Sequence, residues 1–176
     1  MRTSFFVYLN LVKPKEIVIS AEIGVAKGEN AVEMLKNCEL LKLYGVDPYP
    51  SGNEEERKEM FENLKPFGTR YQYLDKTSEE ASSHFPDEFF DYVYIDGDHS
   101  YENVLKDLHY WYPKVKVGGM IAGHDAWYVD IAKAIRAFAQ TLEIQGFTTV
   151  MLKDEPAFSD EALYMDWWIN KRGFLA

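Results

Sequence analysis

Apolar residues recur along the chain with two different spacings, one typical of strands and one typical of helices. From Glu16 onward, short runs rich in β-branched and aromatic residues alternate with longer runs whose apolar residues recur at helical spacing. This order is typical of a parallel sheet covered by helices on both faces. The predicted strands are 16–22, 41–46, 70–74, 89–95, 120–123, 147–152 and 163–170.

Helices are predicted between these strands and before the first of them. An amphipathic helix is expected over residues 4–12, and Asn53, Ser78 and Ser100 mark helix starts by the side chains that commonly cap them. The pair Gly118 and Gly119 predicts a turn before the fifth strand. Only residues 153–162 separate the last two strands, too few for a crossover helix. We therefore expect that pair to be antiparallel in an otherwise parallel sheet.

Length and composition favour one domain over residues 1–176. The chain has 176 residues, of which 47% are hydrophobic, enough for one core. Cys38 is the single cysteine, which excludes a disulfide framework within the chain and a cysteine-based zinc site. These features predict a cytoplasmic location, where thiols stay reduced.

The net charge of the chain restricts the classes of binding partner. A formal net charge of -10 gives no strong signal for binding to nucleic acid or to an anionic membrane, because both need a basic surface. The apolar run 4–12 is too short to cross a bilayer. A homo-oligomer stays open.

Acidic residues recur where the predicted strands end. Glu22, Asp47 and Asp96 end strands, and Asp125 lies just beyond another. Ligands of open α/β sheets bind at the carboxyl ends of the strands. The repeated placement predicts a functional site there, although any one of these acids alone could be an ordinary loop residue.

The first turn is rich in glycine but does not match a dinucleotide-binding motif. Gly24 and Gly28 would allow a ligand to approach the backbone closely. Ala26 and Glu29 occupy the positions where G-x-G-x-x-G needs its second and third glycines. Asp47, about 25 positions after Glu22, lies where a second-strand acid accepts hydrogen bonds from ribose hydroxyls. Glu22 and Glu29 bring negative charge to the turn, which is therefore better suited to a cationic ligand than to a diphosphate.

Three runs resemble the class I S-adenosylmethionine-dependent methyltransferases: AEIGVAKGENAVEML, LYGVDPYPSG and FFDYVYIDGDHSYENVLKDLHYWYPKVKVGGMIAGHD. The likeness covers about residues 17–126 and is most specific to the subfamily with an IDGDHSY segment, which includes metal-dependent sugar and small-molecule O-methyltransferases. It implies a Rossmann-like three-layer α/β sandwich, with a mostly parallel seven-stranded sheet whose last strand is antiparallel.

The resemblance also assigns cofactor-binding residues. It implies that Glu22, Gly24 and Gly28 surround the methionyl part of S-adenosyl-L-methionine and that Asp47 binds its ribose. Thr77 and Ser78 fall where this fold lines the adenine pocket, although they could equally cap the short helix that begins there. Asp96, at the end of the fourth strand, completes the predicted cofactor-binding set.

A metal site is predicted beside the cofactor. Asp96, His124 and Asp125 would bring carboxylates and an imidazole together at two neighbouring strand ends. Mg²⁺ or another divalent metal would suit them, with Zn²⁺, Mn²⁺ and Fe²⁺ left open. Metal-dependent relatives hold their ion with acids at these positions, and His124 departs from that pattern. His124 and Asp125 could instead have structural roles.

Asp98 and His99 are the candidate catalytic bases. Either could take the proton of an acceptor hydroxyl during methyl transfer, with Asp98 as first choice. The resemblance also implies a small-molecule or sugar acceptor as the partner. Two other functions stay open: a metal-dependent hydrolase, whose earlier D-x-H motif this chain lacks, and a noncatalytic cofactor-binding or assembly protein.

Overall fold

A computed structural model describes residues 2–144, 150–152 and 166–171. The strands are β1 (Val18–Ile23), β2 (Leu41–Val46), β3 (Tyr71–Leu74), β4 (Phe90–Ile95), β5 (Val115–Gly123), β6 (Val150–Leu152) and β7 (Trp167–Asn170). The helices are α1 (Thr3–Val12), α2 (Glu29–Asn37), α3 (Glu54–Leu64), α4 (Ser78–Ser82), α5 (Tyr101–Trp111) and α6 (Val129–Ile144), with the 3-10 helix η1 (Lys65–Arg70) after α3.

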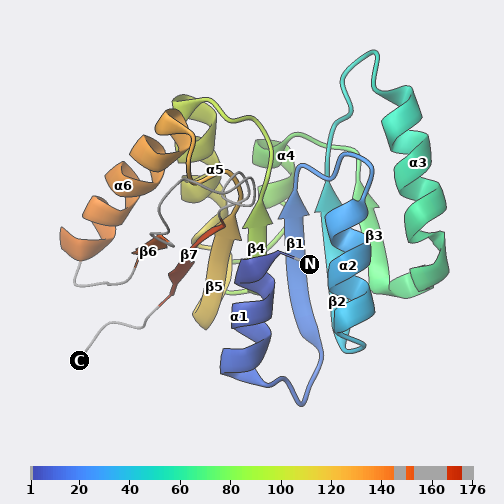
Figure 1. Cartoon of the computed structure of the whole chain (residues 1–176), viewed down its shortest axis with the longest axis horizontal. Coiled ribbons are helices and arrows are strands. Elements are labelled where there is room, and N and C mark those ends of the chain that lie inside the picture. The colour runs from blue at the N-terminus through green and yellow to red at the C-terminus, as the bar shows by residue number, and fades with distance from the viewer. Residues whose placement is uncertain (1, 145–149, 153–165, 172–176) are drawn as a thin grey trace.

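The strands form one seven-stranded sheet in the order β3-β2-β1-β4-β5-β7-β6. The pairs among β1 to β5 are parallel, and β7 runs antiparallel to both β5 and β6. The predicted fold class, with its single reversed strand, is confirmed. The arrowheads of β4, β1 and β2 point to the same edge of the sheet (Figure 1), so the residues that follow these strands gather there.

Helices cover both faces of the sheet (Figure 1) and bury two separate sets of apolar side chains. Alternate residues of one strand face opposite layers: Tyr92 and Tyr94 pack with α1 and α2, whereas Val93 and Ile95 pack with α5 and α6. Burial on both faces explains why the central strands read as nearly continuous hydrophobic runs. The result is the expected three-layer sandwich.

The fifth strand begins earlier than predicted. Val115 already pairs with Phe90, and the register then shifts before Met120 pairs with Tyr92. Gly118, which has a φ of 85°, lies within this irregularity, and its amide donates to the carbonyl of Lys171 at 2.7 Å. The expected turn at Gly118 and Gly119 was therefore wrong, because a glycine with positive φ can form a bulge inside a strand.

The last two strands are paired as predicted. Val150 pairs with Ile169, and Leu152 with Trp167, in antiparallel register. The predicted linker at 153–162, and the outer parts of both predicted strands at 147–149 and 163–165, lie outside the described residues. No helix in the described part of the chain is long and apolar enough to cross a membrane.

Candidate active site

A cavity of about 740 Å³ opens at the carboxyl edge of the sheet. Its walls come from the turn after β1, the loop after β2, the start of α4, the loop after β4 and one side of α5. They include Gly24, Asp47, Thr77, Ser78, Asp96, Asp98 and Asp107. This volume lies within the range of small-molecule and cofactor sites. Five predicted cofactor-binding residues thus line one cavity, while Glu22 and Gly28 are not among its lining residues.

Backbone geometry explains why the turn after β1 contains glycines. Gly24 has a φ of 84°, and a Cβ there would lie 2.3 Å from the carbonyl oxygen of Asp96. Gly28 has a φ of 76°, and a Cβ there would lie 2.8 Å from Cδ1 of Leu64 on α3. Gly24 thus lets the loops after β1 and β4 pass close together, and Gly28 lets α2 start against α3. The predicted contacts of both glycines with the cofactor stay predictions.

Asp47 ties the end of β2 to this turn. Its Oδ2 accepts hydrogen bonds from the amides of Val25 at 3.0 Å and Ala26 at 3.1 Å, while Oδ1 accepts from the amide of Tyr49 at 2.9 Å. Three amides therefore hold the carboxylate in place at the cavity wall. A carboxylate fixed in this way is well placed to accept further hydrogen bonds from a ligand hydroxyl.

Glu22 is buried at the carboxyl end of β1, with 1% of its surface exposed. Burial raises its pKa to about 8, although a hydrogen bond from Nδ2 of Asn30 opposes the shift. Its Oε2 is buried and has no hydrogen-bond partner among the described residues. An ammonium group would supply both the missing donor and a compensating charge, so this orphan oxygen fits the amino group of S-adenosylmethionine.

Thr77 and Ser78 have both structural positions and places on the cavity wall. Thr77 caps α4 in a reciprocal capping box with Glu80, as the structural alternative predicted. The hydroxyl of Ser78 donates to Oδ1 of Asp107 and accepts from Nε1 of Trp111 at 2.8 Å. Their predicted role at the adenine is compatible with this arrangement, because Ser78 is held in a fixed position beside the cavity.

The sequence analysis missed Asp107, whose side chain links α5 to this network. Burial raises its pKa to about 6, against the lowering effect of the bond from Ser78. The signal for it was present: Asp107 falls on the helix face marked by Val104, Leu108 and Trp111, where an acid interrupts an otherwise apolar stripe. A charged residue on a buried face needs a partner.

Asp96, His124 and Asp125 converge as predicted, with one potential ligand atom from each lying within 4.8 Å of the others. Nδ1 of His124 lies 3.2 Å from Oδ1 of Asp125 and 3.8 Å from Oδ1 of Asp96. Burial raises the pKa of Asp96, and the nearby His124 and Arg2 oppose that shift. We call these three residues the acidic corner.

Arg2, which the sequence analysis did not single out, also reaches the acidic corner. Its Nη2 lies 3.2 Å from Oδ2 of Asp96, and its Nη1 lies 2.6 Å from Nε2 of His124. The guanidinium therefore contacts two of the three predicted metal ligands. In this arrangement the donor set does not fit a divalent cation, because Arg2 already engages the side chains that would have to bind it.

The two candidate bases differ in their surroundings. Asp98 lines the cavity, but its Oδ1 accepts a hydrogen bond from the amide of Ser100 at 2.7 Å, which helps to lower its pKa. Nε2 of His99 lies 3.4 Å from Oδ2 of Asp125, and its ring packs against Tyr128 at 5.6 Å between centroids. A lowered pKa weakens Asp98 as a proton acceptor. Which of the two residues acts as the base stays a prediction.

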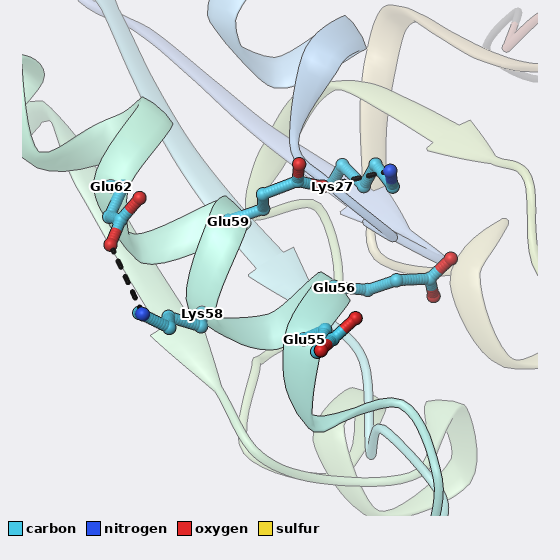
Figure 2. Close-up of a pocket in the computed structure, with 6 residues that line it drawn as sticks. All are labelled: Lys27, Glu55, Glu56, Lys58, Glu59 and Glu62. Carbon is cyan, nitrogen blue, oxygen red and sulfur yellow. Dashed lines mark ion pairs between the residues drawn. The ribbon is translucent and has the colours of Figure 1, made fainter.

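A second concave surface, along α3, has a different character (Figure 2). It is lined by charged residues only: Lys27, Glu55, Glu56, Lys58, Glu59 and Glu62. Lys27 pairs with Glu59 at 2.9 Å, and Lys58 with Glu62 at 3.9 Å. These are exposed ion pairs of the kind common on helix surfaces, and they do not form a built site.

Comparison with known proteins agrees with this geometry. Residues 21–126 match the family model described as "Methyltransferase domain". A curated relative, uncharacterized protein R132 of Acanthamoeba polyphaga mimivirus, is 31% identical over 138 residues, which are 73% of this chain and 62% of that protein. The chain belongs to the methyltransferase domain family.

Solved structures show the same fold at low identity. A proposed methyltransferase from Streptococcus mutans in complex with SAH aligns with a TM-score of 0.72 and 16% identity, over 97% of this chain and 98% of that one. Precorrin-6y C5,15-methyltransferase from Geobacter metallireducens gives 0.70 and 17%, over 95% and 87%. A SAM-dependent O-methyltransferase from Thermotoga maritima gives 0.68 and 16%, over 97% and 64%.

Proposed function

We propose that this chain transfers a methyl group from S-adenosylmethionine to a hydroxyl oxygen of a small molecule or sugar. The observation that carries the proposal is the cavity itself, which joins Gly24 and Asp47 on one side to Asp96 and Asp98 on the other. One space therefore connects the residues suited to the cofactor with the loop that carries the candidate bases.

The chain's own residues would bind and orient the cofactor. Asp47 would accept hydrogen bonds from the ribose hydroxyls. Glu22 does not line the cavity, but its Oε2, which has no hydrogen-bond partner among the described residues, would receive the amino group if the ligand reaches below the cavity wall. Ser78, fixed by Asp107 and Trp111, would present its hydroxyl to the adenine. S-adenosylmethionine supplies an already activated methyl group when bound, so the protein mainly aligns the acceptor and excludes water.

His99 is the base that the geometry favours. Asp125 lies against one nitrogen of its ring and Tyr128 against its face, so the imidazole is held in place beside the acidic corner. It would take the proton of the acceptor hydroxyl as the oxygen attacks the methyl carbon. Asp98 is the alternative base, since it lines the cavity directly.

An acceptor with a ring face fits the surface next to His99. Trp127 and Tyr128 are 44% and 45% exposed, and their rings lie 4.2 Å apart between centroids. Exposed aromatic rings beside a base favour stacking with a sugar or a phenol. The Thermotoga maritima relative in fold is named as an O-methyltransferase, which agrees with transfer to oxygen. The mechanism uses no divalent metal, because Arg2 engages Asp96 and His124.

The test combines cofactor binding with turnover. Calorimetry with S-adenosylhomocysteine should give saturable binding at one site per chain. Methyl-labelled S-adenosylmethionine should then label at least one member of a panel of sugars and phenols, and the product should be an ether by mass spectrometry. Absence of S-adenosylhomocysteine binding would refute the proposal. Binding without transfer to any panel member would favour the noncatalytic alternative.

A cytoplasmic location and a homo-oligomer stay predictions from sequence.

A further inference from the structure

The N-terminal helix is fastened at the point from which Arg2 extends. Oδ2 of Asp166 accepts hydrogen bonds from both the amide and the hydroxyl of Ser4, each at 2.8 Å. Ser4 is fully buried, and its hydroxyl also lies 2.8 Å from that of Tyr92 on β4. A carboxylate at the first turn of a helix satisfies amides that the helix leaves free. Asp166 therefore fixes the start of α1, although it lies far away in sequence.

Aromatic packing holds the same helix against the sheet. The ring of Phe5 lies 5.1 Å from that of Tyr92, and the ring of Tyr8 lies 5.3 Å from it. Both side chains are almost completely buried. Arg2 therefore extends from a rigid support. Its side chain is 27% exposed, and its guanidinium reaches Asp96 and His124.

The contact between Arg2 and His124 determines which ring nitrogen carries the proton. A guanidinium has only donors, so Nη1 of Arg2 can hydrogen-bond to Nε2 of His124 only if Nε2 offers its lone pair. In a neutral imidazole, Nδ1 must then carry the hydrogen. Nδ1 faces Oδ1 of Asp125 at 3.2 Å, an acceptor for that hydrogen.

This tautomer is incompatible with a metal ion in the acidic corner. Nδ1 is the nitrogen of His124 that faces Asp96 and Asp125, and a metal held between the three residues would need its lone pair. Nε2 would then carry the hydrogen and point it at the N–H of Arg2, so two donors would meet at 2.6 Å. Binding a metal there requires Arg2 to leave.

We propose that Arg2 is the resident cation of the acidic corner, where it neutralises Asp96, fixes the Nδ1–H tautomer of His124 and excludes divalent metal. Arg2 is thus a positioning residue, which acts through Asp96 and His124. The proposal concerns the site of the proposed function, but its tests need neither cofactor nor acceptor. A failure here would leave the S-adenosylhomocysteine binding described above unaffected, so the two proposals can fail separately.

Nitrogen NMR tests the tautomer directly. In the wild-type protein labelled with ¹⁵N at histidine, long-range correlation spectra should show His124 with a protonated Nδ1 and an unprotonated Nε2; a His124→Gln sample assigns the signals. In Arg2→Met, which keeps a long side chain but removes the donors, that preference should be lost. A protonated Nε2 in the wild type, or an unchanged pattern in Arg2→Met, would overturn the proposal.

Manganese binding tests the exclusion of metal. Mn²⁺ titrations followed by electron paramagnetic resonance should show at least tenfold tighter binding to Arg2→Met than to the wild type, and the gain should vanish in Arg2→Met/Asp96→Asn. Lys15→Met removes one positive charge at an exposed position, as Arg2→Met does at the acidic corner, and should bind Mn²⁺ like the wild type. Circular dichroism melting verifies that each variant is folded. Equal Mn²⁺ affinity in the wild type and Arg2→Met, or a gain that persists without Asp96, would overturn the proposal.

Discussion

The two halves of the carboxyl edge of the sheet are built by different means. After β1 and β2, the turn is shaped by backbone: Gly24 allows a close approach, and three amides hold Asp47. After β4 and β5, the arrangement depends on side-chain charge, with Arg2 drawn into contact with Asp96 and His124. The first half is therefore sensitive to shape, and the second to the balance of charges.

The largest expected effect lies in the charged half and concerns the base. His99→Asn should lower kcat by roughly 10²–10⁴-fold, the usual contribution of a general base. Asp98→Asn should lower it less than about tenfold, because the pKa of Asp98 is already lowered by its hydrogen bonds to Ser100. Single-turnover methyl transfer with saturating cofactor measures both variants. His84→Asn, at an exposed histidine, is the matched control. A larger loss in Asp98→Asn would restore Asp98 as the base.

Substitution of Gly24 tests the shape of the other half. Gly24→Ala should reduce the free energy of unfolding by about 3 kcal/mol, which combines left-handed strain with overlap on the Asp96 carbonyl. Gly118→Ala is a close control, since its φ of 85° nearly equals the 84° of Gly24 but nothing lies within 4 Å of its added Cβ. Urea denaturation should give a loss of about 1–2 kcal/mol for the control. Equal losses would show that the close approach to Asp96 contributes nothing.

Substitution of Asp47 tests whether the half after β1 and β2 binds the cofactor. Asp47→Ala should raise the Kd for S-adenosylhomocysteine by about 10-fold to 100-fold, as expected for lost hydrogen bonds to a charged group. Asp47→Asn keeps one acceptor oxygen and should have a smaller effect. Asp75→Ala is the control, because that exposed carboxylate pairs with Arg57 instead. Calorimetry that finds wild-type affinity in Asp47→Ala would remove Asp47 from the site.

The smallest expected effect is the pH dependence due to Glu22. Its folded pKa of about 8 lies above the ordinary value of 4.5, so the folded state keeps a proton that the unfolded state releases. Stability should therefore fall as pH rises from about 4.5 to 8, by about 1.4 kcal/mol between pH 6 and pH 7. In Glu22→Gln this contribution should be absent, and Tm should change less over that interval by about 3 °C. Parallel Tm profiles for both proteins would contradict the raised pKa.

Local patterns predicted most of the fold. The alternation of strand and helix runs located β2 at its observed bounds, Leu41–Val46, and the short linker predicted the antiparallel pairing of β6 and β7. The fifth strand was predicted too short because a glycine pair resembles a turn in sequence, and only pairing with β4 and β7 shows that it is a bulge. Such pairing depends on the tertiary structure.

The candidate site was predictable where its parts are close in sequence or share a strand end. Asp96, His124 and Asp125 were found because parallel strands deliver them to one edge. Arg2 could not be found in this way, since it lies 94 residues from Asp96 and 122 from His124, and no local pattern distinguishes it from a surface arginine. The helical periodicity of α5 could have identified Asp107, because it places this acid on the buried face, but the sequence analysis missed it.

The bond between Asp166 and the start of α1 also constrains the order of events during synthesis. The two residues it joins, Ser4 and Asp166, are 162 positions apart. At a translation rate of about 5–20 residues per second, the helix waits roughly 8–30 s before its anchoring carboxylate has been made. During that time Phe5 and Tyr8 lack the completed support that holds them in the finished molecule. The nascent helix, with its apolar residues, is therefore made long before the carboxylate that fastens its first turn.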